Sequence, residues 1–206
     1  VHYLMLMLNI KDAFELNFVK YKHKERGILH LMAIHGHKYL FRELAERFPV
    51  FDLNIEDEEE STPLLLAIKY KRVEMIKFLL SQPSTDLNKS SKKYGHPLHM
   101  AIESQEQKLA LRLLKYQTKF PSKFLDINAK SEEGNNALHF LFLTFYSNSE
   151  LSINLAKTLI KQGINVNQKN KNNLTPLLIA IANNQYDAVA FILNYNRETR
   201  EKLQWK

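Results

Sequence analysis

The chain has 206 residues, of which 45% are hydrophobic and 25% are charged, a composition that predicts a folded globular protein and excludes a largely disordered one. Its formal net charge of +7 comes from 29 basic and 22 acidic side chains. Acidic runs such as residues 56–60 interrupt the basic ones, so the sequence lacks the clustered basic face that nucleic acids need, and nucleic acid is not an expected partner.

The sequence also lacks the residue patterns that usually carry chemistry. It contains no cysteine, which excludes disulfide bonds, thiolate zinc sites and cysteine nucleophiles and fits a reducing compartment. Glycine-rich phosphate loops and nucleophile-elbow motifs are absent as well. The longest apolar run, residues 137–146, is about half of the roughly 20 residues that cross a bilayer. We therefore expect a cytoplasmic protein that is not an enzyme, binds no metal or cofactor and has no membrane span.

The apolar first residues, 1–8, follow neither an initiator methionine nor a basic region. A signal peptide carries a basic segment ahead of its apolar core, so we do not predict one here. The sequence is instead expected to begin inside a longer protein.

Residues 61–80 predict two short helices that form a pair. Ser61 or Thr62 can cap the first helix, Pro63 suits its first turn, and apolar residues follow at helical spacing. Residues 69–72 interrupt the apolar pattern before it resumes in the second helix. Each helix is shorter than the roughly 12 to 15 residues that an isolated helix needs, so the pair must pack against similar pairs.

Copies of this unit recur along the chain. The leucines that match Leu64 are Leu29, Leu98, Leu138 and Leu177. Successive copies are 35, 34, 40 and 39 residues apart, which indicates an internal repeat close to the class of roughly 33 residues.

The repeated motifs resemble those of ankyrin repeats. Thr-Pro-Leu occurs at residues 62–64 and 175–177, and Leu-His occurs at residues 29–30, 98–99 and 138–139. A second ankyrin marker, an acidic residue or asparagine followed by an aliphatic residue and asparagine, recurs near the ends of the copies. It stands at residues 15–17, 52–54, 86–88, 126–128 and 165–167. The resemblance implies an all-α fold, an ankyrin-repeat solenoid of stacked helix pairs with projecting β-turn fingers.

The resemblance covers nearly the whole chain, as one array over residues 1–196. The predicted boundaries are a partial repeat at 1–17 and fuller repeats near 18–54, 55–88, 89–128, 129–167 and 168–196. The charged segment 197–206 is predicted to be a C-terminal cap or the start of a linker. The predicted helix pairs are 28–35 with 38–47, 63–70 with 73–81, 97–104 with 107–116, 137–145 with 151–161, and 176–183 with 186–194.

Three repeats depart from the Thr-Pro signature, and two carry insertions. His96, Asn136 and Gly27 stand where a capping threonine is usual, so weaker helix capping is predicted there. Residues 118–124 and 144–150 account for the longer repeat spacings. Each insertion is either simply tolerated or a place where a partner makes a specific contact, and both readings stay open.

Three histidines share the second position of the Leu-His motif: His30, His99 and His139. They recur at repeat spacing and not at the spacing of metal ligands. Each ring is therefore predicted to hydrogen-bond the backbone between neighbouring repeats.

The charge of the predicted fingers alternates along the array. It is mainly basic at residues 22–26, acidic at 57–60, basic at 92–93, acidic at 132–133 and basic at 169–171. Neighbouring fingers could attract each other, which contributes at most about 1 kcal/mol for each exposed pair. Alternatively, the row could set the register of a partner that itself carries mixed charge. The sequence favours neither interpretation.

Proteins of the resembled family generally bind other proteins through the finger tips and the inner face of the first helices. The finger positions that match are Lys24, Arg26, Glu58, Glu59, Lys92, Lys93, Glu132, Glu133, Lys171 and Asn172. The matching positions on the inner helix ends are His35, Lys69, Tyr70, Glu103, Ser104 and Asn183. Tyr70 is the strongest single candidate, since an aromatic residue with a polar tip is the type that dominates binding energy.

The resemblance implies a protein-protein interaction scaffold whose concave face and finger tips bind another protein or another domain of the same chain. One alternative is the regulatory ankyrin region of a larger enzyme or membrane channel whose chemistry lies outside these residues. Nucleic-acid binding is a third hypothesis, which would appear as an affinity that falls steeply with salt.

Overall fold

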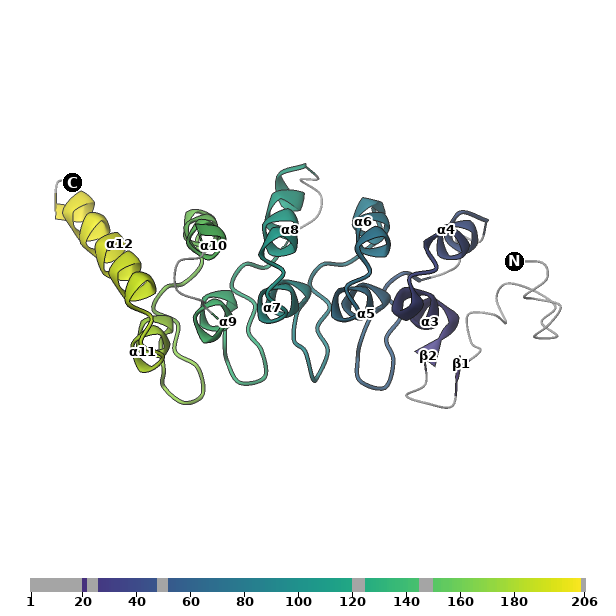
Figure 1. The fold of residues 1–206 in the computed structure, drawn as a ribbon, viewed down its shortest axis with the longest axis horizontal. Helices are drawn as coiled ribbons and strands as arrows, with labels where there is room; N and C mark the ends of the chain where they lie inside the picture. Colours follow the sequence, from purple (N-terminus) through teal and green to yellow (C-terminus); the bar gives the residue numbers. More distant parts are fainter. Residues whose placement is uncertain (1–19, 22–25, 48–51, 120–124, 145–149, 205–206) are drawn as a thin grey trace. The chain divides into compact units, whose positions relative to one another are not determined.

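The computed structural model describes residues 20–21, 26–47, 52–119, 125–144 and 150–204 (Figure 1). These residues divide into two compact units, unit 1 up to Met100 and unit 2 from Ala101. The division falls inside helix α7 (Pro97–Glu103).

Unit 1 holds a short hairpin followed by helix pairs. Strand β1 (Lys20–Tyr21) pairs antiparallel with β2 (Arg26–Gly27) at the base of the first finger. The first helices α3 and α5 pack on each other, and the second helices α4 and α6 do the same, as can be followed in Figure 1. Their bounds are α3 Ile28–His35, α4 Lys38–Arg47, α5 Pro63–Lys69 and α6 Val73–Ser81.

Unit 2 repeats this arrangement. Helix α9 packs on α11, and α8 packs on α10. The bounds are α8 Gln107–Lys119, α9 Ala137–Leu143, α10 Glu150–Lys161, α11 Pro176–Ala182 and α12 Tyr186–Gln204. The predicted stack of helix pairs joined by fingers is confirmed.

A residue with left-handed backbone follows the first helix in four repeats. The φ angles are 75° at Gly36, 54° at Lys71, 62° at Gln105 and 55° at Asn184. Glycine and asparagine adopt this conformation at little cost, whereas lysine and glutamine do so less readily. The left-handed residue reverses the chain, so that the second helix packs beside the first.

Helix capping departs from the sequence prediction in one repeat. The Thr62 hydroxyl accepts a hydrogen bond from the Leu65 N–H at 3.3 Å, as a Thr-Pro start predicts. Asn136 caps α9 with two such bonds, from the N–H groups of Leu138 and His139 at 3.1 and 3.3 Å. The prediction of weaker capping is therefore wrong for this repeat, because asparagine is as good an acceptor as threonine. At Gly27 no side chain caps α3, as expected.

Two helices run beyond their predicted ends. Helix α8 continues to Lys119, so the insertion predicted at 118–124 begins as helix, and residues 120–124 lie outside the described part. Helix α12 continues without a break to Gln204, so the charged segment after residue 196 extends the last helix. This segment contains no Gly or Pro, and its Arg, Glu, Lys, Leu and Gln residues have high helix propensity. The second insertion, 144–150, is described only at its two ends.

Four of the fingers that the structure describes are closed by a short polar side chain at their start. The Asp57 carboxylate accepts hydrogen bonds from the N–H groups of Glu59 and Ser61, at 3.0 and 2.8 Å. Asn170 uses its amide oxygen in the same way toward Asn172 and Leu174, at 3.0 Å each. The repeat-equivalent residues are Ser91 and Ser131, whose hydroxyls accept from Tyr94 and Asn135. Side chains that bond their own backbone two to four residues on are what fix such turns.

The acidic-aliphatic-asparagine marker has a structural role between repeats. In unit 1 the Asn54 amide donates to the Ser84 carbonyl at 2.8 Å and accepts from the Asp86 N–H at 2.7 Å. In unit 2, Asn128 donates to the Gly163 carbonyl at 3.3 Å and accepts from the Asn165 N–H at 2.7 Å. An amide side chain carries a donor and an acceptor on separate atoms, so one asparagine can make both bonds at once, which explains the asparagine in the marker.

Candidate partner-binding surface

The predicted binding residues differ in how accessible they are. Lys24 lies outside the described residues, and Arg26 is buried, with 8% of its surface exposed. Glu59, Lys69 and Ser104 are half-buried. The exposed positions are His35, Glu58, Tyr70, Lys92, Lys93, Glu103, Glu132, Glu133, Lys171, Asn172 and Asn183.

Arg26 is held inside unit 1 by acidic residues of the next finger. Its Nε lies 3.0 Å from the carboxylate of Asp57, whose side chain is fully buried, and its Nη2 lies 3.9 Å from Glu59. A buried arginine whose charge is matched in this way is not available to a partner. Arg26 therefore belongs to the scaffold of unit 1 and not to a binding surface.

The third finger is joined to the second by further ion pairs. Lys89 lies 2.8 Å from Glu56, and Lys92 lies 2.9 Å from Glu60. The Lys92 N–H also donates to the Glu59 carbonyl at 3.2 Å. The oppositely charged second and third fingers of unit 1 thus attract each other. Of the two interpretations of the alternating charge, this is the structural one, in which neighbouring fingers stabilise each other.

The fingers of unit 2 are joined through neutral groups. The Lys171 N–H donates to the Glu133 carbonyl at 2.9 Å, and the Asn170 amide donates to the Asn135 amide oxygen at 2.9 Å. Among the described residues of this unit, no ion pair joins Glu132 or Glu133 to a neighbouring finger. These carboxylates remain exposed at the finger tip.

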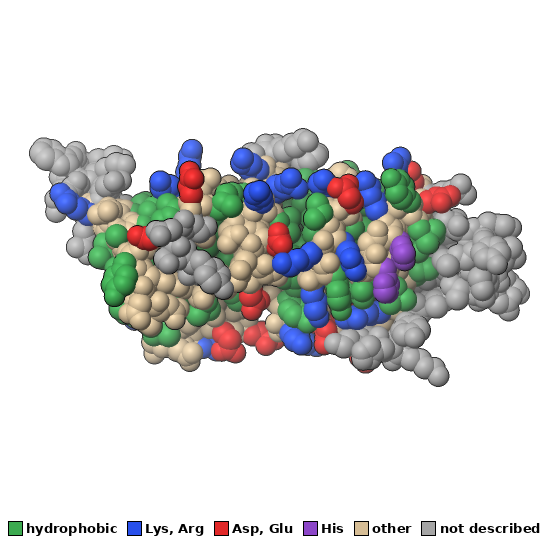
Figure 2. All heavy atoms as spheres, viewed as in Figure 1, with side chains coloured by type: hydrophobic (Ala, Val, Ile, Leu, Met, Phe, Trp, Pro, Cys, Tyr) green, Lys and Arg blue, Asp and Glu red, His purple; other side chains and the backbone are tan. Residues whose placement is uncertain are grey.

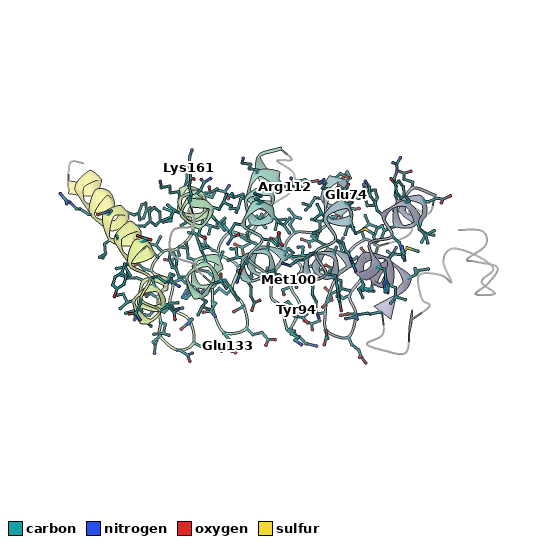
Figure 3. All side chains as sticks on the ribbon, in the orientation of Figure 1. Glu74, Tyr94, Met100, Arg112, Glu133 and Lys161 are labelled. Carbon is teal, nitrogen blue, oxygen red and sulfur yellow. The ribbon has the colours of Figure 1, made fainter. Side chains whose placement is uncertain are left out.

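Two lysines and two tyrosines come together where the third finger of unit 1 meets the end of α5. The Lys69 ammonium donates to the Tyr94 hydroxyl and lies 4.3 Å from the centre of the Tyr94 ring and 5.5 Å from that of Tyr70. Lys93 lies 5.4 Å from the Tyr94 ring. We call these four residues the Lys-Tyr cluster; Tyr94 is labelled in Figure 3, and Figure 2 shows basic side chains over α5 and the neighbouring fingers.

Two of the Leu-His histidines, His30 and His139, hydrogen-bond the backbone of the next repeat of their own unit, as predicted. His30 Nδ1 accepts from the Gly27 N–H at 3.0 Å, so Nε2 carries the proton and donates to the Ile55 and Ser61 carbonyls, each 3.0 Å away. His139 accepts from the Asn136 N–H at 3.1 Å and contacts the Leu174 carbonyl through Nε2 at 3.1 Å. Burial lowers the pKa of both imidazoles, which keeps them neutral.

The described ranges carry neither a metal-ligand cluster nor a membrane-spanning helix. No group of three or more His, Cys, Asp or Glu side chains there is placed to hold a metal ion. Within the same ranges, every helix is too short or too polar to span a bilayer.

Comparison with known proteins identifies the family. A family model described as ankyrin repeats in three copies matches residues 4–91, 29–124 and 117–202. The chain belongs to the ankyrin-repeat family. Ankyrin repeats generally serve as protein-protein interaction modules. The predicted binding residues lie on the fingers of this ankyrin array and at the ends of its first helices.

Similar proteins carry ankyrin regions inside much longer chains. The chain is 31% identical over 132 residues to a probable serine/threonine-protein kinase of Dictyostelium discoideum, covering 62% of this chain and 14% of that protein. It is 30% identical over 160 residues to the nuclear factor NF-kappa-B p105 subunit of Gallus gallus, covering 75% and 15%. It is 27% identical over 170 residues to the human transient receptor potential cation channel subfamily A member 1, covering 82% and 14%.

A solved structure supports the fold. The crystal structure of the ankyrin repeat domain of Bcl-3, a unique member of the IkappaB protein family, matches with a TM-score of 0.67 and 20% identity. The match covers 87% of this chain and 75% of that chain. At this identity it bears on the ankyrin fold alone.

Tyr94 is not among the binding residues predicted from the sequence. It directly follows Lys92 and Lys93 in the predicted finger, and an aromatic residue beside a basic pair is a usable signal. Its contact with Lys69 could not be foreseen, because the two residues are 25 positions apart and meet only when the finger folds back over α5.

Apart from the Lys-Tyr cluster, unit 1 has a groove of about 370 Å³ between its second helices, α4 and α6. Its charged lining is internally matched: Lys38 and Lys77 lie 3.3 and 2.6 Å from Glu74, and Arg42 lies 2.7 Å from Glu46. Such exposed pairs leave little net charge for a partner to recognise.

Proposed function

We propose that this ankyrin array is a protein-binding scaffold and that the Lys-Tyr cluster of unit 1 is the centre of its binding surface. The observation that carries the proposal is the grouping of two tyrosines and two lysines on the finger side of α5. Tyrosine combines a large apolar ring with a polar tip, and residues of this type dominate the binding energy of protein interfaces.

The other predicted positions of unit 1 lie outside the Lys-Tyr cluster, and those of unit 2 are proposed as binding residues of that unit by itself. Arg26 is not proposed as a binding residue, because it is buried and paired with Asp57. The retained exposed or half-buried positions are His35, Glu58, Glu59, Lys92, Glu103, Ser104, Glu132, Glu133, Lys171, Asn172 and Asn183. A reducing compartment such as the cytoplasm remains the proposed location, because the sequence has no cysteine.

A second candidate function is regulation of a larger protein that contains these repeats. The kinase and the channel among the similar proteins favour it, because the chain spans only 14% of each. In that case the bound partner is another domain of the same chain. The Lys-Tyr cluster would then contact that domain, and no chemistry is assigned to residues 1–206.

The double variant Lys69→Ala/Tyr70→Ala tests the proposal. We expect it to weaken partner binding about tenfold or more, as loss of a hot spot does, while the melting temperature stays nearly unchanged. The measurement is quantitative affinity purification from the native cell extract with the chain as bait.

The chain provides a matched control on the other side of unit 1. Lys38 and Tyr39 are also adjacent in sequence, and the Lys38 ammonium also lies over the neighbouring ring, at 5.9 Å. Lys38→Ala/Tyr39→Ala removes the same two side-chain types and should leave partner recovery unchanged. If both double variants recover equal amounts of partner, the Lys-Tyr cluster is not the binding site.

A further inference from the structure

We propose that the Lys-Tyr cluster binds an acidic segment of the partner, in which aspartate or glutamate side chains meet Lys69 and Lys93. This inference rests on the proposed function and specifies the chemistry of the partner.

The charges of unit 1 leave these two lysines unmatched. The carboxylates at 56, 57, 59 and 60 pair with Lys89, Arg26 and Lys92. Neither Lys69 nor Lys93 has a carboxylate partner among the residues that the structure describes. Two ammonium groups that contact the same Tyr94 ring, and that no described carboxylate pairs with, favour a negatively charged ligand.

Lys69 is also held in place before any partner arrives. Its ammonium donates to the Tyr94 hydroxyl and lies over the Tyr94 ring. An ammonium has three N–H donors, so two remain for a carboxylate. Because a lysine side chain normally loses considerable freedom on binding, ordering it in advance favours association.

The tyrosines limit which acidic segments fit. Tyr70 is 37% exposed, and its ring lies 5.5 Å from the Lys69 ammonium. An aliphatic or aromatic residue next to the acidic one can pack against this ring while the carboxylate reaches Lys69. The expected partner segment therefore alternates acidic and apolar residues.

The test uses the whole chain labelled with nitrogen-15 and a short peptide of alternating glutamate and leucine as the probe. We expect the backbone amide signals of residues 69–70 and 93–94 to shift on titration. Lys69→Met/Lys93→Met should weaken peptide binding about tenfold, the effect of removing two modest charge pairs.

The matched control removes the same charge elsewhere. Lys108 and Lys130 are exposed lysines of unit 2, and Lys108→Met/Lys130→Met should change the affinity less than about twofold. Equal weakening by the two double variants, or no binding of the glutamate peptide, would overturn the proposal. Binding of a phosphoserine version of the peptide alone would also overturn it, in favour of phosphate recognition.

Failure of this inference can be told apart from failure of the proposed function. If the native partner is lost with Lys69→Ala/Tyr70→Ala while the glutamate peptide does not bind, the surface is correct and its acidic ligand is wrong. If the native partner is retained by that variant, the proposed site itself is wrong.

Discussion

Gly134 and Gly163 share a left-handed backbone but differ in what surrounds them. Their φ angles are 77° and 89°. A Cβ atom on Gly134 would lie 3.2 Å from the Lys171 nitrogen and 3.3 Å from the Asn170 Cα, whereas one on Gly163 would meet nothing within 4 Å. Glycine at position 134 therefore serves two purposes: it adopts the left-handed backbone, and it leaves room for two neighbouring fingers to approach closely.

This difference predicts unequal costs for the same substitution. Gly163→Ala should lower the free energy of unfolding by about 1 to 2 kcal/mol, the cost of left-handed backbone in a residue with a Cβ. Gly134→Ala should lower the free energy of unfolding by roughly 1 kcal/mol more than Gly163→Ala does, or by a larger amount, because the backbone of the next finger must move. Urea denaturation of both variants measures the difference, and equal losses would show that the fingers are not in contact here.

The buried histidines predict a dependence of stability on pH. Burial lowers the pKa of His30 and His139 in the folded chain, whereas in the unfolded chain it is about 6.5. Below that value the unfolded chain binds more protons than the folded one, so stability falls as pH falls through about 6.5 and toward the folded-state pKa. The melting temperature should accordingly decrease between about pH 7.5 and pH 5.5.

The variant His30→Gln separates this effect from the titration of carboxylates. It should be less stable than the parent at about pH 7.5, because a buried hydrogen-bond network is lost, but its stability should fall less on acidification. His37→Gln, the same substitution at an exposed position, is the control. A His30→Gln slope as steep as that of the parent would contradict a neutral, buried His30.

At the level of the helices, burial depends on the neighbouring repeat and not on the sequence of the helix itself. Ile68 of α5 and Ile181 of α11 occupy the same position of the repeat, six residues after the Thr-Pro threonine. Ile68 is 0% exposed and Ile181 is 52% exposed. In unit 2 the corresponding Phe142 of α9 is fully buried, and Gln185, which follows α11, donates to its carbonyl.

The same substitution at these two sites should therefore have different effects. Ile68→Ala should cost about 2 to 5 kcal/mol, as is usual for a buried large-to-small change. Ile181→Ala should cost less than about 0.5 kcal/mol, since exposed substitutions fall in that range. Chemical denaturation of the two variants measures this, and comparable losses would mean that the face of α11 is covered.

Much of the fold could be predicted from periodicity and capping residues alone. The predicted helices at 28–35, 38–47 and 73–81 have the same bounds as α3, α4 and α6. The exposure of Ile181 could not be predicted, because its helix has the same apolar pattern as α5. The extent of α12 was missed because no glycine or proline marks where a charged helix stops.

The candidate site was less predictable than the fold. The alternating finger charges were visible in the sequence, but which of them pair within unit 1 depends on side-chain positions. Arg26 shows this, since a basic finger residue that looked suited to a partner is buried against Asp57. Tyr94 shows the converse, because only the folded finger brings it to Lys69.

For the whole molecule, we propose that the ankyrin array binds a partner through the finger side of α5 in unit 1. Repeat proteins of this kind bind partners on an extended concave surface. That surface lies on one side of the helix pairs, so we expect binding on that side alone. Tyr70 directly follows α5, the first helix of one pair, whereas Tyr39 lies on α4, the second helix of another pair. Tyr39 is the more exposed, at 83% against 37%.

The most direct test replaces each of these tyrosines in turn with a photo-crosslinking phenylalanine analogue and irradiates the native complex. We expect the partner to be covalently captured from position 70 and not from position 39, despite the greater exposure of Tyr39. Capture from position 39 alone, or equal capture from both positions, would contradict it.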